Sequence, residues 1–192
     1  MQSRHVLIPA LLALFSTPVL AAGPGKDETG PKLGFTFEAD FEYGGDDYAT
    51  VSFTDGSSQD VKAGQGLTLA LGGQYKPSGE SPFGVRATMG YKFVTTAASN
   101  ADIGIERLVF EVLGNYRWPS NWWVGAGITR HTNIKFTGDG FAPDVNFDDA
   151  TGPTVEVGWK WLALSYTNIE YKDEFGFNYD ASSFGLTLTS KF

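Results

Sequence analysis

One histidine follows the leader of this sequence, and it stands beside a hydroxyl side chain. His131 precedes Thr132, and either Glu106 or Asp102 could orient the imidazole. An imidazole that removes the proton from a hydroxyl is the basis of nucleophilic hydrolysis. The same spacing also fits a histidine at the start of a loop. We therefore expect no enzymatic activity, and keep a lipid hydrolase that uses His131 as an alternative.

Acidic residues gather in three stretches that lack regular hydrophobic alternation. Carboxylate oxygens bind Ca²⁺ and Mg²⁺, cations that also bridge lipopolysaccharide phosphates. Residues 136–153 do not have the ligand spacing of an EF-hand, so we expect solvated acidic loops with no dedicated metal and no cofactor. Phe136, Phe141 and Phe147 could contact a partner or pack onto the fold. The acidic residues are Asp46, Asp47, Asp55, Asp60, Asp139, Asp144, Asp148, Asp149, Asp173, Glu174 and Asp180.

The composition excludes other classes of function. The 192 residues include 14 basic and 22 acidic side chains, a net charge of −8, so we expect no binding to nucleic acid. The chain has no cysteine, which excludes disulfides, thiol chemistry and cysteine-bound metals. Its 24 glycines and 15% aromatic residues favour twisted sheets over helices.

The first residues have the pattern of a secretory signal peptide. Arg4 precedes an apolar run, and small residues around Ala21 form a cleavage site. We expect cleavage of residues 1–21, a short periplasmic segment at 22–32 and one folded domain at 33–192. No later stretch is long and apolar enough for a transmembrane helix.

The rest of the chain alternates apolar and polar residues with a period of two, as β-strands do. In residues 33–43, phenylalanines share one face and three carboxylates share the other. The alternation falls out of phase at Ile169 and Tyr171. The pattern predicts eight strands, at 33–43, 66–75, 83–93, 105–116, 122–130, 154–159, 162–171 and 182–192.

The connections between these strands alternate strictly in length. Long connections lie at 44–65, 94–104, 131–153 and 172–181, and short ones at 76–82, 117–121 and 160–161. Outer-membrane barrels have long loops at one end, with tight turns and both termini at the other. Strands of about 9–11 residues span a membrane when tilted. We therefore expect an all-β fold, an eight-stranded antiparallel up-and-down transmembrane β-barrel.

The two faces of the predicted strands differ in chemistry. The interior of an eight-stranded barrel is only wide enough for its own side chains, so polar faces turned inward should form a hydrogen-bonded plug. A narrow path for cations is the alternative. The expected interior charges are Glu38, Asp40, Glu42, Arg86, Lys92, Arg107, Glu111 and Glu156.

The tryptophans gather beside the short turns. Such aromatic residues form girdles at membrane interfaces. We expect one girdle made of Trp118, Trp122, Trp123, Trp159 and Trp161.

Together these features resemble the small eight-stranded outer-membrane barrels of the OmpX and OmpA transmembrane-domain type, over about residues 33–192. The leader, the alternating loop lengths and the closing FGLTLTSKF carry the resemblance, with Ser190 where that group usually has an aromatic residue. In that group, the barrel-assembly machinery reads an alternating last strand that ends in Phe. The resemblance therefore implies this partner for Phe184, Leu186, Leu188 and Phe192.

The resemblance also implies a location. The barrel would lie in the bacterial outer membrane, with periplasmic termini and extracellular long loops, in contact with lipid and lipopolysaccharide. It brings no catalytic motif.

We therefore expect a non-enzymatic integral outer-membrane protein with a plugged interior and acidic loops for surface contact or envelope stability. A soluble periplasmic carrier of the lipocalin type is also an eight-stranded meander, and would bury the apolar face around a ligand. A hydrolase at the membrane rim would resemble the outer-membrane deacylases, which place a serine two residues after their histidine. In this chain that position is Asn133.

Overall fold

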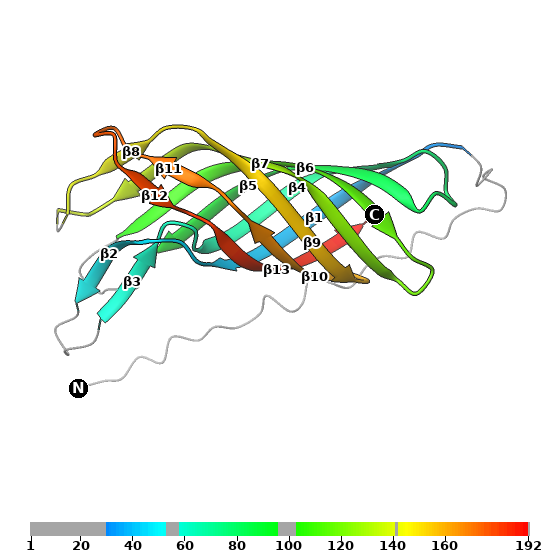
Figure 1. Ribbon diagram of the computed structural model, residues 1–192, viewed down its shortest axis with the longest axis horizontal. Helices are drawn as coiled ribbons and strands as arrows, with labels where there is room; N and C mark the ends of the chain where they lie inside the picture. The colour runs from blue at the N-terminus through cyan, green and yellow to red at the C-terminus, as the bar shows by residue number, and fades with distance from the viewer. Residues whose placement is uncertain (1–29, 53–57, 96–102, 141, 192) are drawn as a thin grey trace, which may run out of the picture.

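The computed structural model describes residues 30–52, 58–95, 103–140 and 142–191, which form a closed antiparallel barrel of eight strands (Figure 1). Each barrel strand pairs with the barrel strands before and after it, and β1 pairs with β13, which closes the sheet. This confirms the predicted all-β antiparallel barrel. Its strands are β1 (Lys32–Tyr43), β4 (Gly66–Lys76), β5 (Phe83–Thr95), β6 (Gly104–Arg117), β7 (Trp122–Thr137), β9 (Ala150–Trp159), β10 (Leu162–Thr167) and β13 (Ser183–Lys191).

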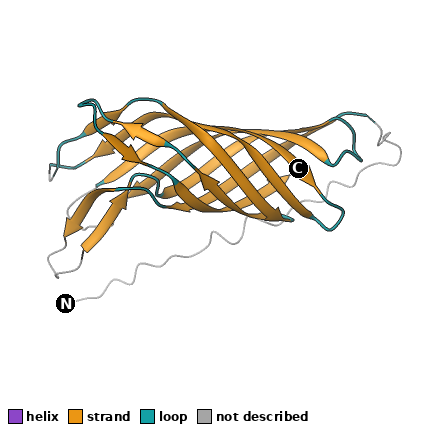
Figure 2. Cartoon of the chain, viewed as in Figure 1, coloured by secondary structure: helices purple, strands orange, loops and turns teal. Residues whose placement is uncertain are grey.

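Five shorter strands extend the barrel at one end (Figure 2). They belong to the long connections, so we call this end the long-loop end and the opposite one the short-turn end. No helix in the described ranges is long and apolar enough to cross a membrane. The short strands are the hairpin β2 (Asp47–Ser52) and β3 (Ser58–Lys62), strand β8 (Val145–Phe147) beside β7, and the hairpin β11 (Glu170–Lys172) and β12 (Asn178–Asp180).

The alternation of the sequence becomes an alternation of burial along each barrel strand. In β9 all ten positions alternate between buried and exposed. Thr154 and Glu156 point into the barrel, whereas Val155 and Val157 are 49% and 45% exposed on the outer wall. The wall is therefore apolar and exposed, and the interior is polar and buried.

Strand β7 is longer than the predicted strand at 122–130. It continues to Thr137 because Ile134 and Phe136 turn inward with 1% exposure each. Asn133 has a φ of 52°, in the left-handed region that asparagine tolerates better than most residues. The register with β6 shifts here, so the simple period of two ends near His131 while the strand continues.

The predicted loop at 131–153 is wrong because β7 continues past His131 and because Pro153 lies inside a strand. It contains the end of β7, strand β8 and the start of β9. Pro153 lies inside β9, where its carbonyl accepts a hydrogen bond from the Asn168 amide at 3.0 Å. The nitrogen of Pro153 faces the same side, beyond the last paired residue of β10, so the ladder with β7 loses no donor.

The predicted strand at 162–171 is interrupted. Strand β10 ends at Thr167, and Tyr171 belongs to β11 in the hairpin above the barrel. The phase break in the sequence marks this change of direction.

An apolar cluster closes the long-loop end. It joins residues from the barrel strands and from the loop hairpins around Tyr171, which has 0% exposure. Phe136 and Phe147 lie in this cluster, so they pack onto the fold and are not exposed. Its buried members are Val61, Ala63, Ile103, Ile105, Ile134, Phe136, Val145, Phe147, Ala150, Ile169, Tyr171 and Ala181.

Some sequence predictions fall outside the described residues. These are the signal peptide at 1–21, most of the segment at 22–32, and the individual residues Asp55, Asp102, Phe141 and Phe192.

Gly127 tests how closely the barrel strands approach one another. A Cβ at this position would lie 1.9 Å from the Val112 carbonyl oxygen, whereas a Cβ at Gly114 meets only the Ala126 carbonyl oxygen, at 3.8 Å. We expect Gly127→Ala to reduce the free energy of unfolding by about 1–3 kcal/mol through overpacking. Gly114→Ala is the matched control, and denaturant unfolding of the refolded protein is the measurement. Equal stability of the two variants would contradict this close approach of β6 and β7.

Candidate functional site

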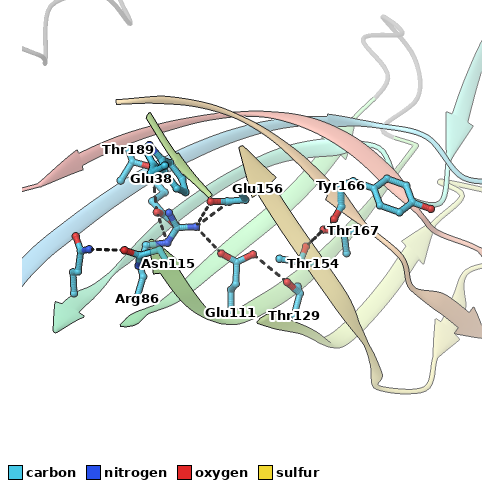
Figure 3. Close-up of polar contacts among 12 residues, drawn as sticks. Glu38, Arg86, Glu111, Asn115, Thr129, Thr154, Glu156, Tyr166, Thr167 and Thr189 are labelled. Atoms are coloured by element: carbon cyan, nitrogen blue, oxygen red, sulfur yellow. Dashed lines mark hydrogen bonds and ion pairs between the residues drawn. The ribbon is translucent and has the colours of Figure 1, made fainter. Parts of the chain in front are cut away.

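The interior charges meet around Arg86 of β5 (Figure 3). Its Nε lies 2.9 Å from Glu38 Oε1, and its Nη2 lies 2.9 Å from Glu111 Oε1 and 2.8 Å from Glu156 Oε2. The guanidinium side chain is 3% exposed, and the three carboxylates come from β1, β6 and β9. One cation therefore links three other strands across the barrel.

Hydroxyl groups add hydrogen bonds to two of these carboxylates. Thr189 donates a hydrogen bond to Glu38 at 3.3 Å, and Thr129 donates one to Glu111 at 3.1 Å (Figure 3). Buried carboxylates persist only when such partners offset the loss of water. Sequence reasoning did not identify these threonines, because a threonine on a polar strand face carries no sign of its partner.

A second ion pair lies nearer the long-loop end. Lys92 Nζ of β5 is 2.9 Å from Glu42 Oε2 of β1, and the lysine side chain is fully buried. Ser183 donates a hydrogen bond to the other oxygen of Glu42 at 2.8 Å. Asp40 lies between Glu38 and Glu42 on the same strand face, and forms no ion pair within the described ranges.

Arg107 of β6 lies above this pair, with 0% exposure. Its Nη2 donates a hydrogen bond to the Gln65 carbonyl oxygen at 2.8 Å, and its guanidinium lies 5.6 Å from the centre of the Tyr171 ring. All eight predicted interior charges therefore point into the barrel, and in the part of the chain that the structure describes their ion pairs form two separate groups, one around Arg86 and one between Lys92 and Glu42.

His131 is buried and does not sit at the start of a solvated loop. Its exposure is 2%, and its Nδ1 lies 2.5 Å from the Tyr171 hydroxyl. Burial raises the pKa of Tyr171 to about 12, although the Arg107 guanidinium lowers it. The contact between His131 and Tyr171 joins residues forty positions apart, so no local pattern could have indicated it.

Those residues of the considered hydrolytic triad that the structure describes, His131, Thr132 and Glu106, are not brought together. His131 points into the barrel, and Thr132 is the next residue of the same strand, where successive side chains turn to opposite faces. Glu106 is on the outer face, where it accepts a hydrogen bond from the Tyr91 hydroxyl. Asp102 lies outside the described residues. The side chain that meets the His131 imidazole in the described residues is therefore the Tyr171 hydroxyl, not Thr132.

Four of the five tryptophans are exposed beside the short turns. Trp123 differs, because it is 3% exposed and turns inward. Its Nε1 donates a hydrogen bond to the Lys160 carbonyl oxygen at 3.3 Å, and its ring lies 5.7 Å from the Arg86 guanidinium. Trp123 therefore corrects the predicted girdle, since the alternation of β7 places it opposite Trp122. The exposed tryptophans are Trp118, Trp122, Trp159 and Trp161.

The last strand carries its apolar residues on the outer wall. Phe184 is 71% exposed and Leu186 is 40% exposed, and Leu188 shares their face. This agrees with the predicted alternation of the closing segment.

The long-loop end is acidic and partly ordered by its own side chains. Lys62 pairs with Asp47, and Arg130 Nη2 lies 2.9 Å from Asp149 Oδ2. Asp173 accepts hydrogen bonds from the amides of Phe175 and Phe177, so it shapes a turn. The described residues hold no group of three or more potential metal ligands.

Removing Arg86 tests the interior cluster. We expect Arg86→Met to lower the free energy of unfolding by about 3–5 kcal/mol, because three carboxylates lose their shared cation. Arg130→Met removes an exposed ion pair and should cost at most about 1 kcal/mol. Urea unfolding of both variants gives the comparison. Similar losses would mean that the buried cluster does not brace the barrel.

The tyrosines of the long-loop end test the apolar cluster. Burial raises the pKa of Tyr48 to about 12, with smaller contributions from Tyr179 and Asp173, and Tyr171 has the same value. The usual tyrosine pKa is about 10. A raised folded pKa favours the protonated form, so this stabilisation is complete below pH ~10 and is lost as the pH rises toward ~12.

Tyrosinate absorbance measured against pH should therefore have a late component near pH 12 that decreases in both Tyr48→Phe and Tyr171→Phe. Ionisation of every tyrosine near pH ~10 in the folded protein would contradict the buried cluster.

No model of a known protein family matches this chain, and comparison with curated proteins finds no match.

Proposed function

We propose that this protein is an integral outer-membrane β-barrel without enzymatic activity, whose acidic extracellular loops serve surface contact or envelope stability. The supporting observation is an inverted distribution of side chains. Leu33 and Phe35 are 84% and 80% exposed, whereas Lys92 and Arg107 are 0% exposed. Soluble proteins rarely expose such a large contiguous apolar surface, and a bilayer supplies the apolar surroundings that it needs.

The apolar wall continues around the barrel. Leu71 and Met89 are 68% and 58% exposed, and Ile128 and Leu164 are 58% and 61% exposed. The exposed tryptophans at the short-turn end support a membrane interface there. Strand β1 begins and strand β13 ends at this short-turn end. In the proposed orientation the short-turn end therefore faces the periplasm, and the long loops are extracellular.

The interior supports a plug more than a ligand chamber or a pore. A carrier of the lipocalin type needs an apolar interior, whereas Arg86 and its carboxylates occupy this one. The apolar cluster around Tyr171 covers the long-loop end of the interior. His131 is buried beneath this cluster, away from any lipid at the rim.

The partners follow from the proposed location. Phe184, Leu186 and Leu188 form the apolar face of a last strand suited to the barrel-assembly machinery. Lipid would cover the wall. The acidic loops would meet lipopolysaccharide through bridging divalent cations, or a basic surface partner.

Fractionation of cells that express the full chain tests this proposal. We expect the protein in the outer-membrane fraction, with a gel mobility that changes when the sample is boiled, because a folded barrel resists detergent. The folded gel band of the Arg86→Met variant should disappear at a lower heating temperature than that of the wild type. Recovery of the wild type as a soluble periplasmic protein would contradict the proposed location.

A further inference from the structure

An apolar groove of about 950 Å³ crosses the outer wall of the barrel. It lies over β5, β6, β7, β9, β10 and β13. Its outward-facing lining residues are apolar or aromatic, whereas the polar lining residues Asn115, Glu156 and Ser165 occupy the alternate, inward-facing positions. The volume falls within the range of about 300–1,000 Å³ that small-molecule sites occupy. The lining is formed mainly by outward-facing residues, and Glu156 is the residue that it shares with the interior cluster around Arg86.

Small residues form the floor of the groove. Gly114 of β6 pairs with Ala126 of β7, and Ala126 pairs with Val155 of β9. A Cβ at Gly114 would meet a single neighbouring atom, the Ala126 carbonyl oxygen at 3.8 Å. Gly114 therefore opens onto the groove. The surface of the wall is lower here because the residues are small, whereas other parts of the wall carry large side chains.

Aromatic pairs stand at the two ends. Phe83 and Tyr116 have ring centres 5.0 Å apart beside the short turns, and Tyr166 and Phe184 have ring centres 4.7 Å apart toward the long-loop end. The row of paired residues from Gly114 to Phe184 crosses four strand spacings of about 4.8 Å, roughly 19 Å in all. Half of a hydrocarbon core is about 15 Å thick, so the groove is long enough for an acyl chain.

Charge distinguishes the two ends of the groove. Lys160 Nζ lies 4.3 Å from the centre of the exposed Trp159 ring, two residues beyond the groove-lining Val157, so this cation lies at the short-turn end of the outer wall. The long-loop end carries the acidic side chains of the loops. An anionic headgroup is therefore favoured at the short-turn end and disfavoured at the other.

We propose that this groove binds an acyl chain of one inner-leaflet phospholipid, with the phosphate beside Lys160. The proposal rests on the proposed membrane location, which puts the short-turn end at the inner leaflet. An acyl chain that lies in the groove contacts the floor and both sides of the groove, whereas an acyl chain on a convex wall contacts protein on one side only. These additional contacts would hold this lipid longer than its neighbours.

Lipid retention tests the site. The full-length protein, purified from outer membranes in detergent, is incubated with palmitoyl-oleoyl phosphatidylglycerol, and bound lipid is counted by native mass spectrometry. We expect one retained lipid on the wild type. Gly114→Leu fills the groove, and loss of two buried methylenes corresponds to about tenfold weaker binding. Ala126→Leu fills the same floor from the next strand and should have the same effect.

Gly73→Leu is the matched control. Gly73 also faces outward from a barrel strand, and its Cβ would meet only the Gly34 carbonyl oxygen, at 3.5 Å, outside the groove. It should retain the lipid as the wild type does. Equal loss in Gly73→Leu, or no lipid on the wild type, would overturn the proposal.

The headgroup is tested separately. Lys160→Gln should weaken retention of phosphatidylglycerol, and purified lipid A should not replace it. Preferential retention of lipid A would overturn the assignment to a phospholipid. Heat-modifiable gel mobility of each sample reports on the barrel itself, so failure of the lipid site with normal mobility leaves the proposed function standing. Loss of outer-membrane location in the wild type would remove both.

Discussion

One guanidinium braces the interior, because carboxylates from three other strands share Arg86. Strands β5 and β9 are not neighbours in the sheet, so the contact between Arg86 and Glu156 crosses the barrel. Removing a charge from water costs several kcal/mol unless partners surround it. A slip of one residue in β5 would turn Arg86 to the apolar wall. The same contact that fills the interior therefore also fixes the register of the sheet.

The two ends of the interior are closed in different ways. At the short-turn end, Trp123 lies between the guanidinium groups of Arg86 and Arg117, at 5.7 and 5.8 Å from their centres. At the long-loop end, the hairpins bring their own apolar residues and form a second core around Tyr171. Arg107 and His131 lie between this core and the ion pairs, and both contact Tyr171. The loops are therefore part of the folded structure and not only a solvated surface.

The barrel was predictable from the sequence because a period of two extends through most strands and because loop lengths alternate. The inward direction of all eight candidate charges followed from the same period. The extension of β7 was not predictable, since a left-handed Asn133 shifts the phase, and Pro153 resembled a loop residue inside β9. The partners were also hidden. The contact of His131 with Tyr171 and the sharing of Arg86 depend on barrel closure, which a local pattern does not encode.

The charge of each end follows from what the proposed orientation makes it contact. Lys76, Arg117 and Lys160 lie at the short-turn end, where phospholipid phosphates of the inner leaflet would favour them. The loops at the other end are rich in aspartate, which repels phosphate unless a divalent cation or a basic surface lies between. An apolar wall alone would insert in either orientation. In the proposed membrane location, the opposite charges at its ends, with loops too large and polar to cross a bilayer after folding, would give the barrel a direction.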